Sequence, residues 1–238
     1  LFEGFLDQGI KQSEGQFFTP IPIVRFLISA LPLEQLINEE NQIPKVIDYA
    51  CGAGHFLTEY ASQIRTYVEK TGDTDIHTYY ENIIGIEKEY RLSKVAQVSA
   101  YMYGQDGIQI RYNDALSQDI SDVKNGTYSI LIANPPYSVK GFLETLSNDD
   151  LSAYELTDSV SDRAKNNAIE TFFVERAKQL LKGGGIAAII LPSSILNKGG
   201  VYAVCREIIL QHFHIVAIAC FGSGTFGKTG TSTVTLFL

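Results

Sequence analysis

The chain has 238 residues, of which 45% are hydrophobic and 19% charged, a balance typical of a globular protein with a buried core. No apolar run reaches the roughly 20 residues that a membrane-spanning helix needs. The formal net charge of −8 weighs against a protein that grips a nucleic-acid duplex by itself, because that grip rests on Lys and Arg contacts with phosphate.

The sequence has three widely spaced cysteines, Cys51, Cys205 and Cys220. Without a Cys-x-x-Cys pair they argue against a disulfide framework and a zinc site, and they favour the reducing cytoplasm. His212 and His214 lack a third ligand, so no metal is expected. Residues 1–10 lack the basic start of a signal peptide. Because the first residue is not Met, we expect the chain to be part of a longer protein.

The first segment, residues 1–36, is predicted to be helical, because apolar residues recur at helical spacing after Pro20. A polar stretch that ends at Pro44 separates this segment from the first buried strand. We therefore expect a helical lead-in over residues 1–42 and one larger domain over residues 43–238.

Short apolar strands then alternate with amphipathic helices. The pattern predicts an α/β fold with a mostly parallel seven-stranded sheet and helices on both faces. The predicted strands are residues 45–49, 83–87, 108–112, 129–133, 185–191, 214–221 and 232–238. The predicted helices are residues 57–69, 89–103, 168–181 and 201–211. A short Gly/Thr-rich link joins the last two strands, so the last strand should run antiparallel.

Glycines and polar segments mark the connections. Gly183, Gly184 and Gly185 follow the predicted helix 168–181 and predict a glycine C-terminus for it. Residues 71–82 and 138–167 are long and polar and are predicted as loops. Loops of this length in a compact domain are often functional.

The first motif with chemical character is Asp48-Tyr-Ala-Cys-Gly52-Ala-Gly54, in which an acid ends a strand and a glycine turn leads to a helix. Gly52 and Gly54 let the backbone approach a ligand, and the helix N-terminus offers unpaired N–H groups. No third glycine completes a dinucleotide fingerprint. Asp48 would repel phosphate but suits a cation such as an ammonium or a sulfonium. A plain tight turn is the alternative.

Two further acids follow predicted strands. Glu87 ends the second strand, where a carboxylate can accept hydrogen bonds from both hydroxyls of a ribose. A solvated strand end is its alternative. Asp114, within Asn113-Asp114-Ala115-Leu116, suits an exocyclic amine, and its alternative is an Asx turn or a helix cap.

The most specific motif is Asn134-Pro135-Pro136-Tyr137, at the carboxyl end of a predicted central strand, where α/β sheets bind ligands. The prolines remove N–H donors and fix the backbone. The Asn134 side-chain oxygen and the Pro135 carbonyl oxygen then serve as acceptors, and Tyr137 adds an aromatic face. The set suits an amine on a planar ring, and the alternative is a rigid turn.

These residues resemble the catalytic motif of amino-directed S-adenosylmethionine-dependent methyltransferases, in the motif order of the adenine-N6 DNA group. Gly15-Gln-Phe-Phe-Thr19-Pro20 resembles a motif of the modification subunits of type I restriction systems, although it could simply cap a helix at Thr19. The resemblance covers residues 15–238. It departs at Tyr49, where proline is common, and at His55, where a small residue is common.

The resemblance implies a Rossmann-like methyltransferase fold with S-adenosylmethionine as the methyl donor. It implies that Phe18 and Thr19 contact the methionine end of the donor and that its amino-acid portion is held by Asp48, Ala50, Gly52 and Gly54. It also implies that Glu87 binds the ribose hydroxyls and that Asp114 lies near the donor adenine. It implies contacts with the target base from Asn134, Pro135, Pro136 and Tyr137.

The reaction that the resemblance implies is methyl transfer to the N6 amino group of an adenine flipped out of DNA, in a restriction-modification system. A separate specificity subunit or domain would then read the DNA, with a restriction subunit as a further partner and no membrane. The acidic charge fits, because the phosphate grip lies elsewhere. Two alternatives stay open: a methyltransferase acting on RNA or on protein glutamine, and a subunit that binds the donor only to support assembly.

Residues 222–229, Gly-Ser-Gly-Thr-Phe-Gly-Lys-Thr, match the P-loop pattern after an apolar strand. A P-loop needs a helix immediately afterwards to aim its N–H groups at phosphate. Here residues 232–238 are predicted as a strand, so the sequence favours a hairpin turn over a nucleotide triphosphate site.

Overall fold

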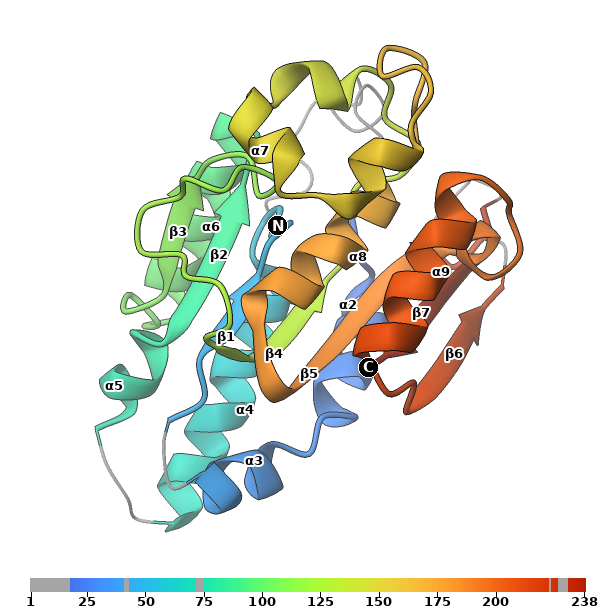
Figure 1. The fold of residues 1–238 in the computed structure, drawn as a ribbon. Coiled ribbons are helices and arrows are strands. Elements are labelled where there is room, and N and C mark those ends of the chain that lie inside the picture. Colours follow the sequence, from blue (N-terminus) through green and yellow to red (C-terminus); the bar gives the residue numbers. More distant parts are fainter. Residues whose placement is uncertain (1–17, 41–42, 72–74, 223, 227–230) are drawn as a thin grey trace.

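The computed structural model describes residues 18–40, 43–71, 75–222, 224–226 and 231–238 (Figure 1). Seven strands form one sheet in the order β3-β2-β1-β4-β5-β7-β6. The strands are β1 (Val46–Asp48), β2 (Ile83–Glu87), β3 (Gln109–Tyr112), β4 (Tyr128–Ala133), β5 (Leu181–Pro192), β6 (Ala217–Phe221) and β7 (Thr233–Phe237). β7 runs antiparallel to β5 and β6, while the pairs among the first five strands are parallel, which confirms the predicted fold.

Helices cover both faces of the sheet, with α8 and α9 on one face and α2, α4 and α6 on the other (Figure 1). The α-helices of the described ranges are α2 (Ile21–Ser29), α3 (Leu33–Glu40), α4 (His55–Thr71), α5 (Ile76–Tyr80), α6 (Tyr90–Met102), α7 (Asn148–Ser152), α8 (Ile169–Leu180) and α9 (Val201–His212). Short 3-10 helices are η2 (Phe142–Thr145), η3 (Glu155–Ser159) and η4 (Ser193–Leu196). Within these ranges no helix is long and apolar enough to cross a bilayer.

The helical prediction for the N-terminal segment is confirmed over α2 and α3, and residues 1–17 lie outside the described ranges. Val24, Leu27 and Ile28 of α2 are fully buried in the same apolar cluster as α4. Each such side chain contributes about 1.5–3 kcal/mol by leaving water. The structure divides the segment between α2 and α3 at Pro32, which has no N–H to continue a helical ladder.

The prediction of a glycine C-terminus for α8 is wrong. The helix ends at Leu180, and Leu181 is already extended as the first residue of β5. The glycines lie within β5 instead, where its pairing with β4 shifts register between Tyr128 and Ile130. A Cβ on Gly185 would lie 2.9 Å from the Tyr128 carbonyl oxygen, so the close approach of the two strands requires glycine there.

Residues 138–167, hereafter the insertion, were predicted as a loop but contain η2, α7 and η3. α7 begins with a capping box in which Ser147 and Asp150 bond each other's backbone N–H groups. The other predicted loop contains α5, which Asp75 caps by accepting from the His77 N–H at 3.0 Å. α5 and α7 have five residues each, too few to show a helical period, so the capping residues Asp75 and Ser147 are the sequence signals for these two helices.

β6 and β7 form the predicted antiparallel pair, and a strand rather than a helix follows the P-loop-like segment. The strand predicted after residues 222–229, which was the reason for preferring a hairpin turn to a nucleotide triphosphate site, is therefore confirmed. Ser223, Gly227, Lys228 and Thr229 lie outside the described residues.

Candidate functional site

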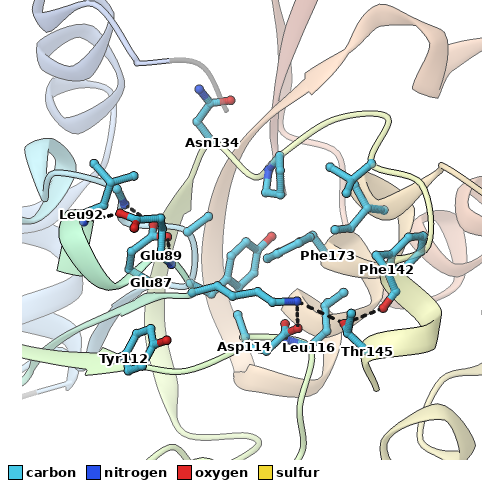
Figure 2. Close-up of a pocket in the computed structure, with 18 of the residues that line it drawn as sticks. Glu87, Glu89, Leu92, Tyr112, Asp114, Leu116, Asn134, Phe142, Thr145 and Phe173 are labelled. Atoms are coloured by element: carbon cyan, nitrogen blue, oxygen red, sulfur yellow. Dashed lines mark hydrogen bonds and ion pairs between the residues drawn. The ribbon is translucent and has the colours of Figure 1, made fainter. Parts of the chain in front are cut away.

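A cavity of about 490 Å³ lies at the carboxyl ends of β1, β2 and β4, next to the insertion (Figure 2). It brings together several residues that were predicted as site residues from separate motifs. Those that line the cavity are Phe18, Ala50, Gly52, Glu87, Asp114, Asn134 and Pro136. Five predicted residues do not line it: Thr19, Asp48, Gly54, Pro135 and Tyr137.

The glycine turn after β1 holds a buried carboxylate just behind the cavity. Asp48 Oδ1 accepts the Ala50 N–H at 3.0 Å, whereas the buried Oδ2 has no hydrogen-bond partner among the described residues. Burial holds the pKa of Asp48 well above its usual range, although the Ala50 N–H lowers it in part. Gly52 has a φ of 52°, and a Cβ there would meet open space. The turn therefore offers an unsatisfied acceptor beside room for a ligand.

Gly54 serves packing between helices rather than the cavity itself. Its φ is +84°, and a Cβ there would lie 3.3 Å from the Ala96 Cβ of α6. The residue thus lets the start of α4 pack closely on α6, and it shapes the turn without lining the cavity.

Glu87 joins the ends of two neighbouring strands. Its Oε2 accepts the Gly52 N–H at 2.9 Å, and its Oε1 accepts the Glu89 N–H at 2.7 Å. Burial raises the pKa of Glu87, and these backbone donors oppose that effect. Each carboxylate oxygen has a second lone pair, so Glu87 can accept two further hydrogen bonds from a ligand.

Asp114 makes the Asx turn that was the alternative to a ligand role, and it also lines the cavity. Its Oδ1 accepts the Leu116 N–H at 3.0 Å. Its Oδ2 lies 2.7 Å from the Lys88 Nζ, which also donates to the Thr145 hydroxyl at 3.1 Å (Figure 2). Lys88, which the sequence analysis did not identify, thereby connects the end of β2 with the insertion across the cavity.

The Asn134 side chain lines the cavity with both ends of its amide in hydrogen bonds. Its Nδ2 donates to the Thr19 hydroxyl at 3.1 Å, and its Oδ1 accepts a hydrogen bond from the Tyr137 hydroxyl. Figure 2 shows Asn134 on one side of the cavity and Asp114 on another. The amide is therefore fixed in orientation by residues before and after it in the chain.

Tyr137 does not present the open aromatic face that the sequence predicts. Its side chain is only 6% exposed and belongs to the apolar cluster on the α2 and α4 face of the sheet. The hydroxyl has one proton, which it shares between Asn134 Oδ1 and the Ile190 carbonyl oxygen, the latter at 3.2 Å. These two acceptors and the apolar surroundings hold the ring inside, and burial raises its pKa well above the usual range.

The turn that contains Asn134 is also held from below by a residue that sequence reasoning missed. Glu170 of α8 is fully buried and accepts the Ser138 N–H at 3.1 Å and the Tyr202 hydroxyl at 2.6 Å. Ten of the twelve residues of α8 are buried, and the sequence does not distinguish a helical glutamate that faces water from one that faces a buried N–H group. Sequence reasoning also missed the aromatic wall of the cavity, where Tyr49 packs on Phe173 with ring centroids 5.0 Å apart.

The lining of the cavity suits an organic ligand that carries a cationic group, hydroxyls and ring amines. It offers the carboxylates of Glu87 and Asp114 from two strand ends, an aromatic wall and one fixed amide. Among the described residues, no cluster of three or more His, Cys, Asp or Glu side chains is placed to hold a metal ion.

The whole chain, residues 1–238, matches the family described as N-6 DNA Methylase. It is 24% identical over 225 residues to the type I restriction enzyme EcoEI methylase subunit of Escherichia coli, covering 94% of this chain and 42% of that protein. It is 23% identical over 257 residues to the EcoKI methylase subunit of Escherichia coli K12, covering 100% of this chain and 43% of that protein. The chain therefore spans less than half the length of these relatives.

Solved structures share the fold. The EcoKI M protein superposes with a TM-score of 0.68 at 21% identity, over 96% of this chain and 44% of that one. A type I restriction-modification methyltransferase subunit from Streptococcus thermophilus superposes with a TM-score of 0.69 at 18% identity, over 100% of this chain and 47% of that one. In each of these two structures the matched part is less than half of the chain.

Proposed function

This chain belongs to the N-6 DNA methylase family, and on that premise we propose that it transfers the methyl group of S-adenosylmethionine to the N6 amino group of adenine in DNA. The observation that carries the proposal is a single cavity that joins Asn134 to Glu87 and to the Ala50–Gly52 turn. That cavity allows a donor and an amine to meet. The family and its curated relatives favour DNA as the acceptor, and neither RNA nor a protein glutamine has similar support.

The residues present fit the donor. Asp48 has a buried oxygen without a partner, which suits the ammonium of the amino-acid portion, and Gly52 leaves room beside it. Glu87 has the spare acceptor capacity for two ribose hydroxyls. When bound, the donor supplies a methyl group on a positively charged sulfur.

At the other parts of the donor, Phe18 would contact the methionine end from the cavity wall, with Thr19 behind it. Asp114 would accept a hydrogen bond from the adenine amine. It would do so either beside the Lys88 ammonium that its Oδ2 already binds or after that ammonium has moved away. Gly54 would support the turn rather than touch the donor.

The target base would bind at Asn134. Its Oδ1 can accept an N6–H bond on its second lone pair, and the Pro135 carbonyl oxygen would accept the other N6–H. These bonds aim the nitrogen lone pair at the methyl group, and such alignment supplies much of the rate. No strong base is required, because the nitrogen becomes acidic as it is alkylated. The base must leave the duplex to reach this site.

Pro136 would keep the turn rigid, and Tyr137 would act in one of two ways. Its hydroxyl orients the Asn134 amide in the observed conformation. Stacking on the base would require the ring to leave its buried position. We propose that the hydroxyl contact prepares the site and that the ring moves toward the cavity when the base enters.

We further propose that a separate specificity subunit or domain reads the DNA and that a restriction subunit completes the system. The relatives are named as subunits of type I restriction enzymes, and the net charge of −8 leaves the phosphate grip to a partner. The division into a lead-in over residues 1–42 and a catalytic domain over residues 43–238 belongs to the same proposal.

The test uses the full-length protein with its specificity partner, duplex DNA and donor labelled in the methyl group. We expect label in N6-methyladenine after digestion of the DNA. Asn134→Ala should lower the rate at least about 100-fold, because aligned acceptors are lost at the reacting nitrogen. Label that enters RNA or protein glutamine instead, or an Asn134→Ala variant with the parent rate, would overturn the proposal.

A further inference from the structure

Glu170 lies directly under the turn that carries Asn134, outside every motif that points to the reaction. It is 0% exposed. Its Oε2 accepts the Ser138 N–H at 3.1 Å, and its Oε1 accepts the Tyr202 hydroxyl at 2.6 Å. A buried carboxylate costs free energy unless hydrogen bonds satisfy it, so these two bonds define what Glu170 does.

The bond to Ser138 controls a turn that is unusual in two respects. Pro135 and Pro136 have no N–H group, so neither can anchor the turn by donating a backbone bond. Ser138 has a φ of 56°, in the left-handed region that non-glycine residues rarely adopt. The Glu170 carboxylate bonds the N–H of this residue and so holds the end of the turn in place.

Tyr202 fixes the carboxylate in turn. Its hydroxyl reaches Glu170 from α9, and its ring lies 4.6 Å from the Lys198 ammonium in the loop that follows η4. Elements on one face of the sheet therefore converge on the same carboxylate. α8 and α9 both set its direction toward Ser138.

We propose that Glu170 is a positioning residue for methyl transfer. Through its bond to Ser138 it holds the Asn134–Ser138 turn in the position in which Asn134 and Pro135 can align the target amine. The proposal rests on the proposed function. Glu170 touches neither the donor nor the base, and it acts only through the backbone of the turn.

The same helix offers a matched control. Glu175 is 1% exposed and also accepts two hydrogen bonds, from the Glu155 N–H at 2.7 Å and the Leu156 N–H at 3.1 Å. It anchors η3, which does not line the cavity. Both carboxylates are therefore buried on α8 and accept backbone N–H groups, but Glu170 holds the Asn134–Ser138 turn and Glu175 holds η3.

The experiment compares Glu170→Ala, Glu170→Gln and Glu175→Ala in the full-length protein with its specificity partner. We expect Glu170→Ala to lower kcat about 10- to 100-fold, since small displacements of aligned groups cost that much, with donor Kd by calorimetry unchanged within about twofold. Glu170→Gln keeps a carbonyl acceptor for Ser138 and should stay within about fivefold of the parent kcat. Glu175→Ala should lower the melting temperature but leave kcat within about threefold.

A second readout is independent of turnover. Hydrogen exchange of a peptide that covers residues 134–146 should speed up in Glu170→Ala and remain at the parent rate in Glu175→Ala. If Glu170→Ala does not fold, Tyr202→Phe, which removes the hydroxyl that donates to Oε1, should lower kcat a few-fold with parent donor affinity.

Two outcomes would overturn the proposal. One is parent kcat and parent exchange in Glu170→Ala. The other is an equal loss of kcat in both alanine variants, in proportion to their loss of stability, since that would show a general packing role. A parent protein with no methyl transfer to DNA would instead count against the proposed function, and the exchange comparison would still test the contact.

Discussion

The cavity has two walls that are held by different means. On the wall formed by the turn after β1 and the end of β2, Glu87 joins the two segments by accepting from Gly52, while Asp48 accepts from Ala50 within the turn. On the insertion wall, the chain is held from α8, which lies beneath it in the same apolar cluster. Neighbouring strand ends can satisfy each other, whereas a long polar segment needs anchors from elsewhere.

Those anchors are charged side chains that the protein buries. Glu170 and Glu175 accept backbone N–H groups of the insertion. Arg176 of the same helix is 0% exposed and donates to the carbonyl oxygens of Ala115 and Ser117, which lie outside the insertion in the segment that carries the site acid Asp114. Glu170, Glu175 and Arg176 all belong to α8, so the insertion and the neighbouring segment around Asp114 depend on the same helix.

Arg176→Met should cause the largest loss of stability, about 3 kcal/mol, because it leaves several buried acceptors unpaired. Arg176→Lys should not restore the parent value, since an ammonium lacks the planar fork that reaches both carbonyls. Urea unfolding of the full-length protein measures the difference. The comparison variant is Arg65→Met on α4, away from the cavity, whose parent side chain donates to Tyr80 and Gly104 near the surface. It should cost less than about 1 kcal/mol, and equal losses would contradict the contrast.

Asp48→Asn should lower donor affinity at least about tenfold, as expected for losing a hydrogen bond to a charged group, while it raises stability at neutral pH. Burial raises the pKa of Asp48 in the folded protein, so the folded state disfavours the charged form. This penalty is absent when the pH lies below the ordinary pKa of the carboxyl, and it grows as the pH rises toward the raised folded value. Calorimetry measures donor affinity, and thermal unfolding measures stability.

The difference in melting temperature between Asp48→Asn and the parent should therefore increase as pH rises from acidic to neutral. A variant that binds the donor as tightly as the parent would remove Asp48 from the donor site. A stability difference that does not change with pH would show that the carboxylate is not the cause.

Tyr49→Phe should raise stability slightly, by up to about 1 kcal/mol, because the Tyr49 hydroxyl is buried and has no hydrogen-bond partner among the described residues. Tyr154→Phe is the matched change in the insertion. Its hydroxyl donates to the Leu116 carbonyl oxygen at 2.7 Å, so its removal should lower stability by about 1 kcal/mol. Thermal unfolding of both variants measures the two changes in stability. If both variants gain or both lose stability, the contrast between the two hydroxyls is wrong.

Lys88→Met should have the smallest effect, a change in donor affinity of no more than about threefold. The Lys88 side chain is 56% exposed, and ion pairs so open to water contribute little. Calorimetric titration with donor, at low and at moderate salt, measures the effect. A tenfold change would show that Lys88 holds the donor itself and does more than connect Asp114 with Thr145.

The sequence predicts the sheet, its strand order of appearance and the antiparallel last strand, because apolar strands and amphipathic helices have distinct periodicities. It also predicts which strand ends carry the site: Glu87, Asp114 and Asn134 lie in one cavity. It does not predict the helices of the insertion, whose few polar residues show no period. It also misplaces the glycine tract, because only the pairing of β4 with β5 reveals the close approach at Gly185.

Local pattern alone therefore determined the architecture and the cluster of acids with one amide, since residues at parallel strand ends must meet at one edge. The tertiary structure alone decided the orientation of Tyr137 and the partners of Glu170 and Arg176. A hydrogen bond between residues 32 or 61 positions apart leaves no periodic trace in the sequence. A charged residue in a helix looks the same whether it will meet water or a buried backbone, and only packing distinguishes the two.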